Sequence, residues 1–132
     1  MARPRREEDK PLTDTEIQIM NVLWDLGAVT VHDVQEALNQ QQGKEYAYTT
    51  VSTMLRVLEK KSVVRSEKQG RGHIYSAGIA QKDYQKKATD HLVEQVFSGS
   101  RSDLLKNLLG AGALSAKDLN EVRELLDSKR KK

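Results

Sequence analysis

Cysteine is absent from the 132-residue sequence, and proline, tryptophan and phenylalanine are scarce, with two, one and one copies. A chain without cysteine forms no disulfide, has no thiol nucleophile and offers no thiolate to a metal, which fits a reducing cytoplasm. Apolar runs of about 18 residues, the length that crosses a membrane, are also missing, so we expect no membrane insertion. Residues 1–11 are rich in charge and contain no apolar stretch, which is not the pattern of a secretory signal. We therefore expect a cytoplasmic protein.

Residues that could carry catalysis are few and scattered. The histidines His32, His73 and His91 fall on three different predicted elements. His91 and Glu94 have the spacing of a helical pair, but such a lone pair is more often a surface contact than a metal site. The sequence contains no nucleophile elbow, no Walker loop and no dinucleotide-binding fingerprint. We therefore expect no enzymatic activity, no bound metal and no cofactor.

Positive charge is concentrated in the middle of the chain, although the formal net charge is only +3. Residues 12–43 contain five acidic residues and no lysine or arginine, whereas residues 44–75 contain seven lysines or arginines and three acidic residues. A basic block directly after an acidic one favours a polyanionic partner on one face of the molecule. The alternative is a solvated surface of mixed charge, and charge alone does not separate the two.

Capping boxes predict the starts of the first two helices. Residues 13–16 read Thr-x-x-Glu and residues 30–33 read Thr-x-x-Asp, and apolar side chains at helical spacing follow each pair. We therefore expect helices over 12–27 and 30–41.

A third helix and a hairpin are predicted next. Helical spacing continues over 48–61, and the segments 63–68 and 73–77 then alternate apolar and polar residues. The turn Gln69-Gly70-Arg71-Gly72 joins these segments, and its glycines tolerate positive φ. The pattern predicts a two-stranded hairpin.

The third predicted helix has two chemically different faces. Val51, Met54, Leu55 and Leu58 stand at i, i+3, i+4 and i+7, and we expect this face to be buried. Hydroxyl and basic side chains occupy the other face, and further basic residues flank the glycines of the hairpin. Such groups suit phosphate oxygens, and threonine methyls and arginine also suit base edges. The candidate DNA-binding residues are Thr49, Thr50, Ser52, Thr53, Arg56 and Lys60 of the helix, and Lys68, Arg71 and His73 of the hairpin.

Three short helices followed by a basic hairpin are typical of a winged helix-turn-helix. Its third helix enters the major groove of DNA, and the hairpin, or wing, lies along the backbone. The expected fold class is mainly α with a small β-hairpin wing, followed by a helical dimerisation domain. Winged helices also serve as protein-docking modules, so an interaction adaptor without a specific DNA site is the alternative function. The charge contrast favours DNA.

Three helices are predicted after the hairpin, over 81–97, 100–110 and 115–132. On the first, we expect one apolar side made of Tyr84, Ala88, Leu92, Val96 and Phe97. The last should start at Ser115 and Asp118, and its inward residues should be Leu119, Val122, Leu125 and Leu126.

These three helices are too few and too short to bury their apolar side chains alone, so we expect a homodimer. The expected interface residues are Leu92, Val96, Phe97, Leu104, Leu105, Leu125 and Leu126. The expected organisation is a flexible arm (1–11), a winged helix (12–78), a dimerisation domain (79–128) and a basic tail (129–132).

The sequence resembles the penicillinase-repressor family of bacterial regulators, the BlaI/MecI/CopY group. The resemblance rests on LTDTEIQIMNVLW, VTVHDVQEALN, YAYTTVSTMLRVLEKKSVV, GRGHIYSA and LLKNLLGAGALSAKDLNEVRELL, in this order, and runs from about Leu12 to Asp127. It implies a dimeric transcriptional repressor that occupies two-fold operators near genes of antibiotic resistance or transport. It also implies a membrane sensor whose signal leads to cleavage within the dimerisation domain, which lifts repression.

The resemblance implies that the cleaved bond is Asn107–Leu108, by its position in LLKNLLG. The penicillinase and methicillin branches carry Asn-Phe there, so Leu108 departs from their pattern. Ser62 is a second departure, because family members usually have glycine after the third helix, and serine occupies such a position at modest strain. The copper-responsive branch senses metal through cysteines near its C-terminus, so the lack of cysteine excludes that chemistry here. The glycines and serines within residues 98–114 favour local opening around the implied bond. The alternative is an ordinary connector helix, with a small ligand bound elsewhere as the signal.

Overall fold

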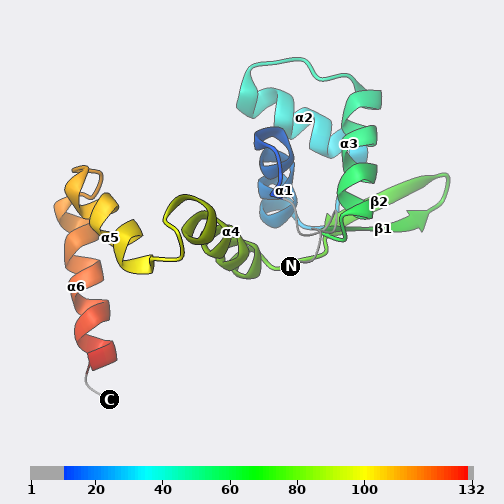
Figure 1. Ribbon diagram of the computed structural model, residues 1–132. Helices are drawn as coiled ribbons and strands as arrows, with labels where there is room; N and C mark the ends of the chain where they lie inside the picture. Colours follow the sequence, from blue (N-terminus) through cyan, green and yellow to red (C-terminus); the bar gives the residue numbers. More distant parts are fainter. Residues whose placement is uncertain (1–10, 131–132) are drawn as a thin grey trace, which may run out of the picture. The chain divides into compact units, whose positions relative to one another are not determined.

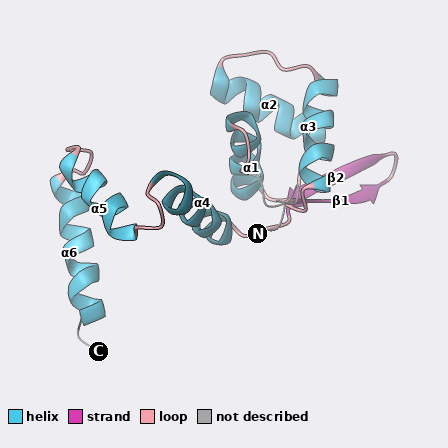
Figure 2. Cartoon of the chain, in the orientation of Figure 1, coloured by secondary structure: helices cyan, strands magenta, loops and turns pink. Residues whose placement is uncertain are grey.

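The computed structural model describes residues 11–130, so most of the predicted flexible arm and the last two residues of the predicted basic tail lie outside it. Helices dominate the described chain, and one hairpin supplies its strands (Figure 1 and Figure 2). The prediction of a mainly helical fold with a hairpin wing is confirmed. The elements are α1 (Asp14–Leu26), α2 (Val31–Gln42), α3 (Tyr48–Lys60), β1 (Val64–Gln69), β2 (Gly72–Ala77), α4 (Gln81–Val96), α5 (Arg101–Gly110) and α6 (Ala116–Arg130).

Apolar faces of the first three helices build the core. The predicted buried face of α3 is confirmed for Val51, Leu55 and Leu58, while Met54 is half-buried and packs against the same core. Each fully buried side chain of this size contributes roughly 1.5–3 kcal/mol to folding. The largest fully buried side chains are Ile19, Met20, Val22 and Leu23 of α1, Val34 and Leu38 of α2, and Val51, Leu55 and Leu58 of α3.

Both predicted capping boxes are present. In the first, the Glu16 N–H donates to Thr13 Oγ1 at 3.2 Å and the Thr13 N–H donates to Glu16 Oε1 at 2.9 Å. In the second, Thr30 and Asp33 exchange the same two bonds at 3.1 Å each. The bonds from the Thr30 backbone and hydroxyl hold the pKa of Asp33 below its usual value. The helix starts predicted from residue spacing are therefore stabilised as expected.

The wing is a tight antiparallel hairpin. Val64 pairs with Ala77 at its base and Gln69 pairs with Gly72 at its tip, so Gly70 and Arg71 alone make the turn. Gly70 has a positive φ of 61°. Glycine at the first central position is preferred in type II′ turns, whose twist matches that of paired strands.

Tyr75 of β2 ties the wing to the helices. Its backbone N–H donates to Val29 O at 2.7 Å, and the Val29 N–H donates to Tyr75 O at 2.9 Å. The Tyr75 side chain is buried in the core, and this burial raises the pKa of its phenol. The base of the wing is thus held on the loop between α1 and α2.

Trp24 extends the first compact unit beyond the hairpin. Its Nε1–H donates to the Ile79 carbonyl at 2.9 Å, and its ring lies 5.7 Å from that of Tyr84 in α4, measured between centroids. Ile79 and Tyr84 both pack against the core of the helices and hairpin. The first unit accordingly runs to Ala88, and a second begins at Thr89, within α4.

The second unit contains the last part of α4 together with α5 and α6. Asp90 Oδ1 accepts a hydrogen bond from Arg101 Nη2 at 2.8 Å, which joins α4 to the first residue of α5. Ser115 and Asp118 exchange capping bonds of 3.2 and 3.1 Å at the start of α6, as predicted.

The apolar side of α4 differs from the predicted one. Its expected residues were Tyr84, Ala88, Leu92, Val96 and Phe97, yet Val93 is the buried residue of this helix, at 2% exposure, and Leu92 and Val96 are exposed. Tyr84 and Val93 are nine residues apart, which places them on opposite sides of a helix of 3.6 residues per turn, so a single apolar side that includes Tyr84 does not include Val93. In α6 the residues expected to face inward are exposed in the single chain; they are Leu119, Val122, Leu125 and Leu126.

Candidate nucleic-acid interface

The outward face of α3 carries the hydroxyl and basic side chains predicted for it. Thr49, Thr50 and Thr53 are exposed, and so are Arg56 and Lys60 one and two turns further along. Because the opposite side of the helix lies in the core, these side chains are fixed on the solvent face. Hydroxyl and guanidinium groups on one helix face are the donors and acceptors that read base edges and phosphates.

Ser52 corrects one expectation. It was expected on the outward face, but it is only 9% exposed because it lies at the edge of the core, next to Val51 and Leu55. Its Oγ accepts a hydrogen bond from Arg56 Nη2 at 3.1 Å. Ser52 therefore orients the arginine instead of presenting its own hydroxyl to solvent.

The predicted wing residues lie together at the tip of the hairpin. Lys68 of β1 pairs in register with His73 of β2, and Arg71 is the second residue of the turn. All three are exposed. The tip of the wing therefore presents two basic side chains and one imidazole.

A groove of about 360 Å³ lies between α3 and the wing. Arg56 lines it from α3, and Arg71 and His73 line it from the wing, so the fold brings together residues that the sequence placed on separate elements. Glu59 is the acidic member of the lining, and its carboxylate accepts a hydrogen bond from Ser66 Oγ of β1. The groove has the charge and chemistry for an anionic strand.

Two outward residues of α3 were missed by the sequence reasoning. Tyr48, the first residue of the helix, is 52% exposed and lines the groove beside Arg56. Val57 is exposed next to Arg56 on the same helix. A tyrosine directly before the Thr49-Thr50 pair was a usable signal, because phenol hydroxyls are common phosphate contacts.

Lys61 is one of the seven basic residues of 44–75, but it does not face solvent. It is 9% exposed, and its Nζ donates to both carboxylate oxygens of Glu16, at 3.1 and 3.0 Å. Burial raises the pKa of Glu16, but bonds from the Thr13 backbone and from Lys61 outweigh it, so the pKa lies below its usual value. Of the two adjacent lysines at the end of α3, only Lys60 faces solvent.

Ser62 follows Lys61 in the left-handed conformation, with φ 66°. Serine adopts here a backbone conformation that glycine reaches more readily. Its N–H donates to Glu59 O at 3.0 Å, and the Val63 N–H donates to Leu58 O at 3.2 Å. These bonds close the end of α3 and direct the chain into the wing.

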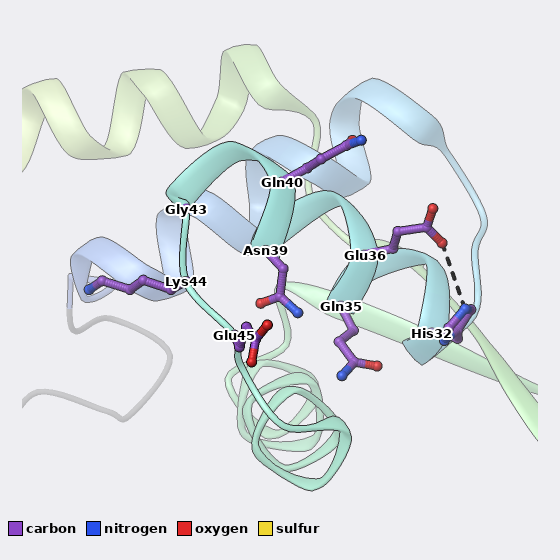
Figure 3. Close-up of a pocket in the computed structure, with 8 residues that line it drawn as sticks. All are labelled: His32, Gln35, Glu36, Asn39, Gln40, Gly43, Lys44 and Glu45. Carbon is purple, nitrogen blue, oxygen red and sulfur yellow. Dashed lines mark ion pairs between the residues drawn. The ribbon is translucent and has the colours of Figure 1, made fainter.

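A second hollow, of about 560 Å³, lies along α2 and the loop before α3 (Figure 3). Two side chains of α2 in it hold that loop: Gln35 Nε2 donates to Tyr46 O at 2.9 Å, and Asn39 Oδ1 accepts from the Tyr46 N–H at 2.6 Å. Figure 3 also shows His32 beside Glu36, with 3.6 Å between Nε2 and Oε2. Within residues 11–130, no cluster of three or more His, Asp or Glu side chains could hold a metal ion. The polar lining therefore mainly positions the start of α3.

The predicted interface and cleavage residues all lie in the second unit, and much of the apolar surface of this unit is exposed in the single chain. Val96, Leu105, Leu125 and Leu126 are among the exposed large apolar side chains of the single chain, and Phe97 and Leu104 are half-buried. Asn107 and Leu108 are both exposed on α5. No helix in the described part of the chain is long and apolar enough to cross a membrane.

Comparison with known proteins decides the family. The family model described as the penicillinase repressor matches residues 12–128. The chain belongs to the penicillinase repressor family. The penicillinase repressor of Bacillus licheniformis is 25% identical over 116 residues, which are 88% of this chain and 89% of that protein. The methicillin resistance regulatory protein MecI of Staphylococcus aureus is 22% identical over 118 residues, which are 89% of this chain and 94% of that protein.

A solved structure also shares the fold. RosR of H. salinarum matches with a TM-score of 0.54 at 17% identity, and the match covers 92% of this chain and 96% of that one. The match of the family model over residues 12–128 confirms the family resemblance inferred from the sequence. Membership of this family places the chain among DNA-binding transcriptional repressors and not among enzymes.

Proposed function

We propose that two copies of this chain bind a two-fold operator in double-stranded DNA and repress transcription in the cytoplasm. In each copy, α3 enters the major groove and the wing contacts the phosphate backbone beside it. The domain at 12–78 reads one half-site, and the domain at 79–128 holds the two copies together. The names of the relatives suggest genes of antibiotic resistance as the regulated genes.

One observation carries this proposal. Arg56 from α3 and Arg71 and His73 from the wing line a single groove, and the exposed threonines of α3 stand beside it. Hydroxyl and guanidinium groups on a helix suit base edges, and positive charges on a glycine-containing turn suit phosphates. A surface that docks a neutral protein does not require base-reading groups on a helix next to phosphate-binding charges on a turn.

Dimerisation is proposed from uncovered apolar surface. Leu125 and Leu126 of α6 are 58% and 54% exposed in the single chain, and Val96 and Leu105 are exposed as well. Apolar patches of this kind on a small unit favour a second copy as cover. A dimer also carries two DNA-binding domains, and these bind two linked half-sites far more tightly than one domain binds one half-site.

Release is proposed to follow cleavage of the Asn107–Leu108 bond after a membrane sensor signals through a protease. Every residue of α5 is exposed except the half-buried Leu104, so few contacts hold this helix closed. Cleavage there separates α6 from the rest of the proposed dimer interface. The two half-site contacts then no longer act as one.

The experiment that tests DNA recognition starts from a randomised duplex library. The full chain is expected to enrich one two-fold sequence and to bind it more weakly as salt rises, because phosphate contacts release counterions. Absence of any enriched sequence, together with weak binding that is independent of salt, would instead support the interaction adaptor. For release, a specific protease site is inserted at 107–108, and the enriched duplex is titrated before and after cutting. A cut protein that stays dimeric and keeps its affinity would refute the cleavage mechanism while leaving the repressor function intact.

A further inference from the structure

Two opposite charges are buried together where α3 meets the wing. Lys61 Nζ contacts both carboxylate oxygens of Glu16, at 3.1 and 3.0 Å. Glu16 is 6% exposed and Lys61 is 9% exposed. The two residues are 45 positions apart in the sequence, so the pair joins the first turn of α1 to the end of α3.

Stability alone is a poor explanation for this pair. Removing two charges from water costs several kcal/mol per ion, and their attraction often does no more than offset that cost. Apolar side chains of similar volume would hold the same helices together as well or better. A buried pair does restrict geometry, because ammonium protons and carboxylate oxygens must meet at hydrogen-bonding distance and angle. It is therefore better suited to fixing the relative position of two helices than to strengthening the core.

The backbone around each partner leaves the pair little freedom. Glu16 Oε1 also accepts the Thr13 N–H at 2.9 Å, so the capping box holds the carboxylate. Lys61 is the C-cap of α3, and its own N–H donates to Val57 O at 3.0 Å. Ser62 then turns the chain with its left-handed backbone, and β1 begins two residues later. The ion pair thus lies between a capped helix start and the junction of α3 with the wing.

We propose that Glu16 and Lys61 are positioning residues for DNA recognition, which set α3 and the base of the wing against α1 without touching DNA. This inference rests on the proposed binding of an operator by α3 and the wing. A small shift of α3 moves Arg56 and Thr53 away from base edges that they must meet directionally, whereas long basic side chains still reach phosphates. Loss of the pair therefore reduces sequence selectivity more than it reduces binding to DNA of any sequence.

Three variants of the full chain separate positioning from folding. Glutamine also completes a capping box, so Glu16→Gln removes the charge and keeps the cap. Lys61→Met removes the other charge and keeps an apolar stem of similar length. The double variant contains both changes and has no unpaired buried charge. Asp25→Asn is the matched control, because Asp25 is exposed on α1 and its replacement changes the net charge by the same amount as Glu16→Gln.

The probes are the duplex that the wild-type chain enriches from a randomised library and a scrambled duplex of equal length. The measured quantity is the ratio of the two dissociation constants, taken at a temperature at which circular dichroism shows each variant folded. The salt dependence of binding to the enriched duplex is recorded in parallel. A role confined to folding does not move this ratio once all variants are folded.

For the double variant we expect a folded protein whose ratio falls by about tenfold, the value of one lost base contact. The log–log salt slope should stay unchanged, because neither residue touches phosphate. Asp25→Asn should keep the wild-type ratio. A double variant that keeps the ratio, one that fails to fold, or a slope flattened by about one unit overturns the positioning role. A wild-type chain that enriches no sequence would refute operator binding itself, and with it this inference, so the two failures are distinguishable.

Discussion

Arg56 and Ser52 lie one helical turn apart on α3, with Arg56 Nη2 donating to Ser52 Oγ at 3.1 Å. The serine is buried and the arginine is exposed, so the bond anchors a flexible side chain to the rigid side of the helix. An arginine held in place before binding loses less rotational freedom when it meets DNA. We therefore expect Ser52 to act on DNA binding through Arg56 and not through its own hydroxyl.

The first prediction concerns that bond. Ser52→Ala should weaken binding to the enriched duplex by about 0.5–1.5 kcal/mol, because Arg56 is no longer held by its neighbour. In an Arg56→Ala background the same change should have almost no further effect, since the two act as one unit. A double-mutant cycle measured by fluorescence anisotropy checks this. Additive losses would mean that Ser52 acts independently of the arginine.

The second prediction concerns Arg56 itself. Arg56→Ala should weaken binding by about 1–3 kcal/mol and relax selectivity at one base pair in each half-site, if its guanidinium meets a guanine edge. Arg56→Lys keeps the charge but loses the two-pronged geometry, so it should retain affinity better than selectivity. Binding to a set of singly substituted duplexes makes the measurement. A uniform loss on all duplexes would assign Arg56 to phosphate instead.

The third prediction separates the wing from α3. Removing Lys68 or Arg71 should weaken binding to every duplex alike and flatten the log–log salt slope by about one unit each. The reason is that both lie at the tip of the wing, where a phosphate contact needs charge but no base geometry. Lys117→Ala, an exposed lysine of α6, is the control and should leave the slope unchanged. A loss confined to one duplex variant would show that the wing reads bases.

The fourth prediction concerns pH. The folded-state pKa of Glu16 lies below its usual value of 4.5, so the unfolded chain binds more protons than the folded one as the pH falls through this region. The stability that Glu16 contributes is therefore fully present above its unfolded-state pKa and is lost as the pH drops through its folded-state pKa. Urea unfolding between neutral and acidic pH should show a smaller acid loss for Glu16→Gln than for wild type. Equal losses would mean that other carboxylates, such as Asp33, account for the acid sensitivity.

The fifth prediction tests the dimer. Leu125→Asp should place a charge in the proposed interface and raise the dimer dissociation constant by about a hundredfold or more. Asn120→Asp adds the same charge at another exposed position of α6 and should leave the dimer intact. Sedimentation velocity over a range of concentrations distinguishes the two. If both variants dissociate the dimer, the added negative charge is the cause and not the position. If neither does, the interface does not include Leu125.

Local spacing along the chain determined where several elements of this protein begin and turn. Thr13 with Glu16 and Thr30 with Asp33 form capping boxes because residues three apart meet at the start of any helix. The two faces of α3 follow from its 3.6-residue period, and the hairpin follows from a glycine that accepts positive φ at its turn. These features depend on neighbours in the chain, which a sequence displays directly.

Tertiary structure decided which side chains are covered and which distant groups meet. Val93 is the buried residue of α4 although the expected apolar side of that helix did not include it, and the 9% exposure of Ser52 depends on how α3 sits in the core. The groove between α3 and the wing exists only once the hairpin folds back beside the helix. Glu16 and Lys61 stand 45 positions apart, and no periodic pattern links them. Their contact depends on the packing of α1 against the end of α3, because burial and pairing are set by distances in space and not by distances along the chain.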